Sequence, residues 1–127
     1  YKDIKLFKGT ADNLKFKPNT FELIIFSFCL YLCDDRDLKK ILFESIRVLK
    51  KKGIILINDF YSQNKKYIKY KHDKRIKSRK MDCSKIFTLH NNISLISRKI
   101  YFDEFSKIFT DENLNKLAIY KLYLNGN

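Results

Sequence analysis

The chain has 127 residues, enough to bury one modest hydrophobic core. Hydrophobic residues make up 45% of it and aromatic residues 15%, which excludes an intrinsically disordered chain. The formal net charge of +13 would suit an anionic partner such as nucleic acid or an acidic membrane surface. Lysine is spread along the whole chain together with Ile, Asn, Phe and Tyr, however, as in proteins from AT-rich genomes. Charge alone therefore does not identify a partner.

Cysteine usage and hydropathy narrow the setting. Cys29, Cys33 and Cys83 are odd in number, and two of them lie in an apolar run, which argues against a secreted disulfide framework. Cys29 and Cys33 lack a second pair or a nearby His at metal-ligand spacing, so we expect no metal. The longest apolar stretch, residues 23–33, is too short to span a bilayer, and no signal peptide opens the chain. We expect a soluble, cytoplasmic protein.

The first two predicted elements are extended. Residues 4–7 form a short extended segment that ends at Gly9, where the missing side chain allows a turn or a close backbone approach. Residues 18–20 predict a second turn. Residues 21–27 are almost continuously apolar, as expected for a central strand of a parallel sheet with both faces covered.

A helix and a third strand follow. Asp34 and Asp35 can cap a helix through their carboxylates, and Asp37 suits its positive end. Gly53 lies where the end of a helix needs a left-handed residue, and residues 54–57 then predict another apolar strand. Strand, helix and strand imply a βαβ crossover. The helix is expected to turn one apolar face to a sheet and its basic residues to water: Leu38, Ile41, Leu42, Ile46 and Leu49 against Lys39, Lys40, Arg47 and Lys50.

The second half changes character after Tyr61. Cations crowd residues 65–80, which predicts a surface insertion or lid. Order is expected to return at Ile86 and Phe87. Residues 93–102 and 117–124 are rich in β-forming residues and are separated by a charged link, residues 103–116, so an antiparallel pair is the economical interpretation.

The order of these segments resembles the second half of the cofactor domain of class I S-adenosylmethionine-dependent methyltransferases, the Rossmann-like type 11 domain. The matching pieces are GTADNLKF, NTFELIIFSF, a helix ending in RVLKKKG, and IILINDF. The resemblance implies an α/β fold: a partial Rossmann-like sheet, mostly parallel, with a C-terminal antiparallel strand pair. We expect a single partial domain, with a cofactor-side half at 1–60, a basic insertion or lid at 61–92 and the terminal strand pair at 93–127.

One part of the family's cofactor domain is missing from this chain. The chain does not begin with Met, and its only glycines are Gly9, Gly53 and Gly126, so no Gly-rich cofactor loop is present. We therefore expect a C-terminal fragment of such an enzyme, inactive alone. In the family's sheet, residues 4–7 would be an edge strand separated from residues 21–27 by two absent strands. Residues 21–27 should then expose an unpaired, apolar edge.

The resemblance implies S-adenosyl-L-methionine as cofactor. The turn at Thr10, Ala11 and Asp12 would pass the adenine; Thr10 stands where Asp is frequent, and Asp12 could replace it. Phe26 and Ser27, at the end of a strand, would line the methionine part. Taken alone, the first set is also consistent with an ordinary turn, and Phe26 with core packing.

The implied reaction transfers a methyl group to a small-molecule acceptor by displacement in aligned geometry. Tyr31, Asp59, Tyr61 and His72 lie at or after strand ends and could meet the acceptor, and His72 suits proton transfer. Simpler interpretations are a half-buried aromatic for Tyr31, a strand-end residue for Asp59 and a solvated imidazole for His72. No catalytic residue is assigned, and the acceptor and the oligomeric state stay open.

Two other functions compete. Residues 64–80 carry Tyr67 and Tyr70 among their cations, which is consistent with contacts to nucleic-acid phosphates and stacking on bases, although no RNA-binding motif accompanies them. Alternatively, the chain is a degenerate interaction module that has lost its cofactor site.

Overall fold

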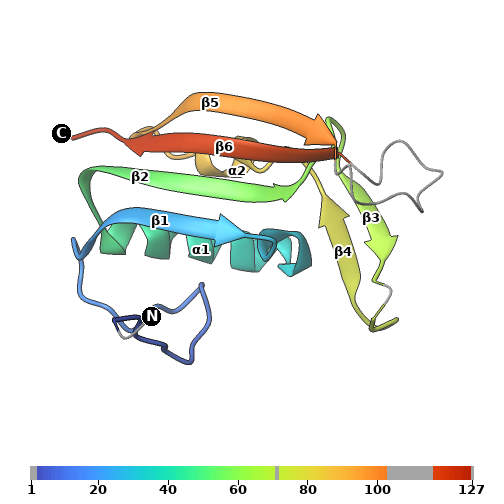
Figure 1. Ribbon diagram of the computed structural model, residues 1–127, viewed down its shortest axis with the longest axis horizontal. Coiled ribbons are helices and arrows are strands. Elements are labelled where there is room, and N and C mark those ends of the chain that lie inside the picture. The colour runs from blue at the N-terminus through green and yellow to red at the C-terminus, as the bar shows by residue number, and fades with distance from the viewer. Residues whose placement is uncertain (1–2, 71, 103–115, 127) are drawn as a thin grey trace.

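The computed structural model describes residues 3–70, 72–102 and 116–126 (Figure 1). Its elements are β1 (Phe21–Ser27), the 3-10 helix η1 (Leu30–Leu32), α1 (Asp35–Val48), β2 (Leu49–Phe60), β3 (Lys66–Lys69), β4 (Lys77–Lys80), α2 (Ser84–Phe87), β5 (Ile93–Phe102) and β6 (Lys116–Leu124). One sheet has four strands in the order β1-β2-β6-β5, and β3 and β4 form a separate antiparallel hairpin. β1 and β2 are parallel, whereas β6 is antiparallel to both β2 and β5. This is the expected α/β class, with a parallel strand–helix–strand unit followed by an antiparallel pair.

Helix α1 covers one face of the sheet, as its amphipathic pattern predicts. It begins after Asp34, whose extended backbone makes it the N-cap; Leu38 N donates to Asp34 O at 2.9 Å. Among the described residues, however, the Asp34 side chain makes no capping hydrogen bond. The buried side chains of α1 are Leu38, Ile41, Leu42, Ser45 and Val48.

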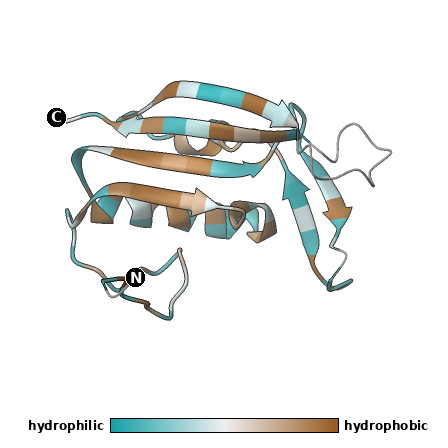
Figure 2. Ribbon diagram, viewed as in Figure 1, coloured by the Kyte–Doolittle hydropathy of each residue, from teal (hydrophilic) through white to brown (hydrophobic). Residues whose placement is uncertain are grey.

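The core lies between α1 and the facing side of the central strands. Alternate residues of β2 are buried, and Ile55 and Ile57 are fully so. Their register partners on β6, Leu122 and Tyr120, are also fully buried. Because side chains alternate along a strand, this register places the apolar residues of both strands on one face. Figure 2 shows the hydrophobic colour along β1 and along much of β2.

The junction between α1 and β2 differs from the expectation. Lys52, not Gly53, adopts the left-handed backbone, with φ 66°. Gly53 is needed for space instead, because a Cβ there would lie 2.6 Å from Leu49 Cγ and 2.8 Å from Lys50 O. β2 also begins earlier than predicted, at Leu49, and its register against β1 shifts between Phe21 and Leu23.

The first segment is not the expected strand. Within the described ranges no strand pairs with residues 4–7, and the side chains of Ile4, Leu6 and Phe7 are 63%, 91% and 69% exposed. A strand requires a neighbour to accept and donate its backbone hydrogen bonds, and none lies beside this segment. Gly9 has open space around it and an ordinary φ, so neither a tight turn nor a close approach requires it.

β1 is an edge strand, as the sequence predicts. Its partner in the described sheet is β2, and its outward side chains Leu23 and Ile25 are 46% and 62% exposed. The edge is apolar from Leu23 to Phe26, between the exposed Glu22 and Ser27, which makes it a template for association.

The remaining predictions concern the second half. The basic insertion is ordered as the β3–β4 hairpin, followed by α2, which begins slightly before the predicted point. The terminal antiparallel pair is present as β5 and β6, with Ile100 opposite Ala118. Residues 103–115 of the predicted charged link lie outside the described residues. No helix within the described ranges is long and apolar enough to cross a bilayer.

Candidate functional site

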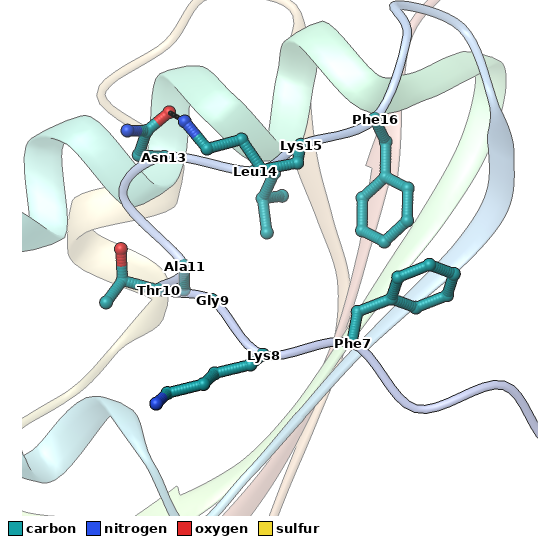
Figure 3. Close-up of a pocket in the computed structure, with 9 residues that line it drawn as sticks. All are labelled: Phe7, Lys8, Gly9, Thr10, Ala11, Asn13, Leu14, Lys15 and Phe16. Carbon is teal, nitrogen blue, oxygen red and sulfur yellow. Dashed lines mark hydrogen bonds between the residues drawn. The ribbon is translucent and has the colours of Figure 1, made fainter.

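The turn at residues 10–13 borders a hollow beside β1. Asn13 N donates to Thr10 O at 3.2 Å, which closes the turn. A hollow of about 240 Å³ is lined by residues 7–11 and 13–16. Figure 3 shows the rings of Phe7 and Phe16 approaching one another across it, with Thr10 on the opposite rim. The two rings meet edge to face at 5.2 Å, so the hollow has an aromatic wall and a polar rim.

Arg47 and Glu44 of α1 hold this segment in place. Arg47 Nη1 donates to Phe16 O and Arg47 Nη2 to Leu14 O, both at 2.8 Å. Glu44 Oε2 accepts from Leu14 N at 2.8 Å, and Arg47 Nε donates to Glu44 Oε1 at the same distance. A planar guanidinium suits this forked arrangement. Arg47 was expected to face water; it is half-buried instead and ties the turn segment to the helix.

The ion pair between Arg47 and Glu44 lowers the pKa of the Glu44 carboxyl. The hydrogen bond from Arg47 lowers the pKa of Glu44 to about 2, and the backbone bond from Leu14 contributes in the same direction. Glu44 therefore stays ionised over the whole physiological range, and the link between turn and helix persists.

The carboxyl end of β1 has an unusual backbone. Phe28 adopts φ 51°, a left-handed conformation that is unfavourable for a bulky residue. Phe28 N donates to Asn58 O at 2.8 Å, so the strand ends with the chain bound to the neighbouring strand β2. Ser27 is exposed here, whereas Phe26 is buried with its ring 5.9 Å from that of Phe87. Such strain is stored where surrounding structure fixes a conformation, often at functional sites.

The Asp59 carboxylate accepts hydrogen bonds from the backbone of the loop after β1. Its Oδ2 accepts from Leu30 N at 2.9 Å and Tyr31 N at 3.2 Å, and its Oδ1 accepts from Phe60 N at 2.8 Å. The residue is fully buried, and burial raises the pKa of its carboxyl to about 6 against the opposing effect of these backbone bonds. Asp59 thus fixes the backbone around Tyr31, and its own oxygens are occupied by backbone amides.

An aromatic group lies at the ends of both parallel strands; we call Phe28, Tyr31, Phe60 and Tyr70 the aromatic cluster. The ring of Phe60 is 5.7 Å from that of Phe28 and 4.9 Å from that of Tyr31. Tyr70 of the hairpin loop is 6.3 Å from Tyr31. Burial, with the hydrogen bond to Tyr70, raises the pKa of Tyr31 to about 12, so its hydroxyl keeps its proton at neutral pH.

Comparison with known proteins identifies the fold. Residues 1–57 match the family model described as a methyltransferase domain. A S-adenosylmethionine-dependent methyltransferase from Methanosarcina mazei superposes with TM-score 0.71 at 11% identity, covering 94% of this chain and 66% of that one. The chain has a class I methyltransferase fold.

Other solved structures agree. A Burkholderia thailandensis N1-methyltransferase with bound 1,6-didemethyltoxoflavin and S-adenosylhomocysteine gives TM-score 0.68 at 10% identity, covering 91% of this chain and 48% of that one. A Thermotoga maritima protein described as a possible histamine N-methyltransferase gives TM-score 0.67 at 16% identity, with 96% and 65% covered. The chain thus spans about two thirds or less of these methyltransferases. No curated protein sequence matches it.

Two of the five predicted cofactor residues lie beside one another in the structure. Ala11 and Phe26 line one apolar hollow along the edge of β1. Asp12 lies on the same turn as Ala11, which the bond from Asn13 N to Thr10 O closes. Thr10 lies on the same turn, and Ser27 directly follows Phe26.

The predicted acceptor residues separate into two groups. Tyr31 is in the aromatic cluster, and the exposed His72 lies beside it, its ring 5.2 Å from that of Tyr70. Asp59 supports the loop from the core. Tyr61 is 9% exposed and belongs to the hydrophobic core, with Arg98 over its ring. In the described residues no group of three or more His, Cys, Asp or Glu side chains could hold a metal ion.

Sequence reasoning missed several contributors. Arg47 was assigned to a water-facing helix surface and Glu44 was not singled out, although their spacing of three residues is that of an ion pair on one helical face. Phe60 was not singled out, although it directly follows Asp59 at a strand end, and Tyr70 was considered only as a residue that could stack on nucleic-acid bases. The pairing of Tyr70 with Tyr31 depends on tertiary packing of the hairpin, for which the sequence holds no local signal.

Proposed function

We propose that the protein acts in S-adenosyl-L-methionine-dependent methyl transfer to a small-molecule acceptor, as part of a longer enzyme. The observation that carries the proposal is that Ala11 of the residue 10–13 turn and Phe26 of β1 line one hollow in a methyltransferase fold. Arg47 binds the segment directly after this turn through Leu14 O and Phe16 O. Ligands of open α/β sheets bind beyond the carboxyl ends of parallel strands. The bound S-adenosylhomocysteine of the Burkholderia relative supports the choice of cofactor.

The residues present fit the adenosine end of the cofactor. Thr10 and Asp12 offer polar groups to a base edge, Ala11 leaves space, and the rings of Phe7 and Phe16 provide an apolar wall. Ser27 and the backbone after Phe26 would face the methionine end. When bound, S-adenosyl-L-methionine supplies a methyl group on a sulfonium, an electrophile that needs alignment more than acid–base help.

On the acceptor side, this chain's own residues would exclude water and orient the nucleophile. The aromatic cluster surrounds the strand ends, and the left-handed backbone of Phe28 fixes the direction of its ring. Tyr31 keeps its proton, so it would donate a hydrogen bond instead of accepting a proton. Asp59 is a positioning residue. The exposed imidazole of His72 is the group available to take a proton from acceptors that must lose one.

We also propose that residues 1–127 alone hold the cofactor weakly. The exposed apolar edge of β1 supports this, since Leu23 and Ile25 there lack the partners that a complete methyltransferase sheet would supply. The partial coverage of the related methyltransferases supports it too.

Calorimetric titration with S-adenosylhomocysteine tests the proposal. We expect binding to the complete gene product, weakened at least about tenfold by Asp12→Ala, and much weaker binding to residues 1–127. Asp3→Ala, on the exposed N-terminal segment, is the matched control and should leave the affinity unchanged. Absence of binding to both proteins would reject methyl transfer and favour an interaction module.

A further inference from the structure

The β3–β4 hairpin covers the end of the sheet where the acceptor would bind. β4 packs against η1, and Tyr70, just after β3, meets Tyr31 of that helix. Lys80 Nζ lies 4.9 Å from the ring centroid of Phe60, at the end of β2. Figure 1 shows the hairpin beyond the arrowheads of β1 and β2. The hairpin therefore borders the aromatic cluster.

Like charges face each other across this hairpin. Its register places Lys66 opposite Lys80 and Lys69 opposite Lys77. Directly opposed like charges destabilise an antiparallel pair. Lys69 and Lys77 are both exposed, whereas Lys80 is buried with its ammonium over the ring of Phe60, so the repulsion acts chiefly between Lys69 and Lys77. A fold that keeps such pairs gains when an anion lies between or over them.

The nearby acids do not neutralise the hairpin. Asp35 serves two cations, Lys65 and Arg79, while Asp73 pairs with Arg75. Lys66, Lys69, Lys74 and Lys77 are exposed, and within the described part of the chain they form no ion pair. The hairpin thus presents a set of cations whose charge is uncompensated by the described residues.

One further cation is buried. Arg79 is 3% exposed, and its Nε has no hydrogen-bond partner among the described residues, although its Nη1 donates to Asp35 at 2.6 Å. A buried donor without an acceptor is rare in folded proteins and indicates a missing partner. An oxyanion could accept a hydrogen bond from Arg79 Nε and also pair with the exposed lysines.

We propose that the β3–β4 hairpin binds a phosphate group, and that the methyl acceptor is a phosphate-bearing molecule held by this group while its body contacts the aromatic cluster. Lysine ammonium groups bind phosphate as mobile point charges. Identification of the phosphate-bearing molecule as the acceptor rests on the proposed function; phosphate binding does not. The phosphate could belong to a small metabolite or to a single-stranded nucleic acid.

Titration of inorganic pyrophosphate into this chain, without cofactor, tests the phosphate site. We expect saturable binding that Lys69→Ser with Lys77→Ser weakens at least about tenfold, while Tm rises because the repulsion is removed. Lys99→Ser with Lys121→Ser removes the same charge from exposed positions on β5 and β6 and should leave affinity unchanged. Equal weakening in both double variants, or no binding to the unmodified chain, would overturn the proposal.

Amide NMR with pyrophosphate tests the connection to the acceptor site. We expect shifts in β3, β4 and the segment 28–31; shifts confined to the hairpin would overturn the assignment to the acceptor. A six-nucleotide RNA identifies the source of the phosphate: binding much tighter than pyrophosphate indicates nucleic acid, and similar or weaker binding indicates a small metabolite. Loss of S-adenosylhomocysteine binding would reject the proposed function while leaving pyrophosphate binding intact, so the two failures are distinguishable.

Discussion

Asp59 combines full burial with three backbone hydrogen bonds, and its ionisation should be visible in stability. Burial raises its pKa from the ordinary 3.8 to about 6 in the folded protein. Between these values the folded state binds more protons than the unfolded state. The stabilising contribution of Asp59 is therefore fully present below about pH 4 and is lost as pH rises through about 6.

This gives a prediction for Asp59→Asn, which cannot titrate. The difference in free energy of unfolding, unmodified minus variant, should fall by about 3 kcal/mol between pH 4 and pH 7, because two pKa units correspond to that energy. Urea unfolding of both proteins across this range measures it, and ionisations shared by both proteins cancel. A difference that rises with pH would show that the backbone bonds lower the pKa instead, and a constant difference would show that folding does not shift it.

Arg47 anchors the segment directly after the proposed cofactor turn, through Leu14 O and Phe16 O. Arg47→Lys keeps the charge but loses the fork that binds Phe16 O, Leu14 O and Glu44 together. In the complete gene product we expect KM for S-adenosylmethionine to rise about tenfold with kcat little changed, and stability to fall by about 1–2 kcal/mol. Arg36→Lys, on the exposed first turn of α1, is the matched control. An equal change in both variants would contradict a positioning role for Arg47.

At the scale of elements, Gly53 decides how α1 connects to β2. Gly53→Ala forces a methyl group against Leu49 Cγ and Lys50 O, where it would lie at 2.6 Å and 2.8 Å. We expect a loss of about 1–3 kcal/mol in the free energy of unfolding, the usual cost of overpacking. Gly9→Ala, which meets open space, should change stability by no more than about 0.5 kcal/mol. Similar small effects at both glycines would contradict this account of the junction.

The exposed edge of β1 is expected to lower the solubility of the isolated chain. We expect residues 1–127 to self-associate and to bind a hydrophobic dye, and Ile25→Lys to reduce both, because a charge on an edge strand opposes pairing. Leu89→Lys, at another apolar side chain with 68% exposure, is the control and should have little effect. Light scattering and dye fluorescence measure both properties. A monomeric chain with a cooperative melt and no dye binding would show that the edge is covered.

At the scale of the whole molecule, periodicity predicted the elements that local pattern controls. The three- and four-residue spacing of Leu38, Ile41 and Leu42 located α1, and the apolar runs located β1 and β2. The terminal pair followed from β-rich segments separated by a charged link. These features depend on which residues are apolar and at what spacing, information that the sequence carries directly.

Features set by tertiary contacts could not be predicted in the same way. Residues 4–7 have strand-like composition, but no strand in the described part of the chain pairs with them. Arg47 looked like a surface cation because its acceptors, Leu14 O and Phe16 O, are backbone atoms some thirty residues away in sequence. The sequence did not predict the hairpin, because the buried residues of β4 are Ser78, Arg79 and Lys80 and not apolar residues.

The central claim is that the turn at residues 10–12 and the end of β1 form one cofactor site. Ultraviolet cross-linking of radiolabelled S-adenosylmethionine to the complete gene product, followed by peptide mapping, tests it most directly. We predict label on residues 10–12 and 26–28, displaced by S-adenosylhomocysteine. Displaceable label confined to the β3–β4 hairpin or to β5 and β6 would contradict the account.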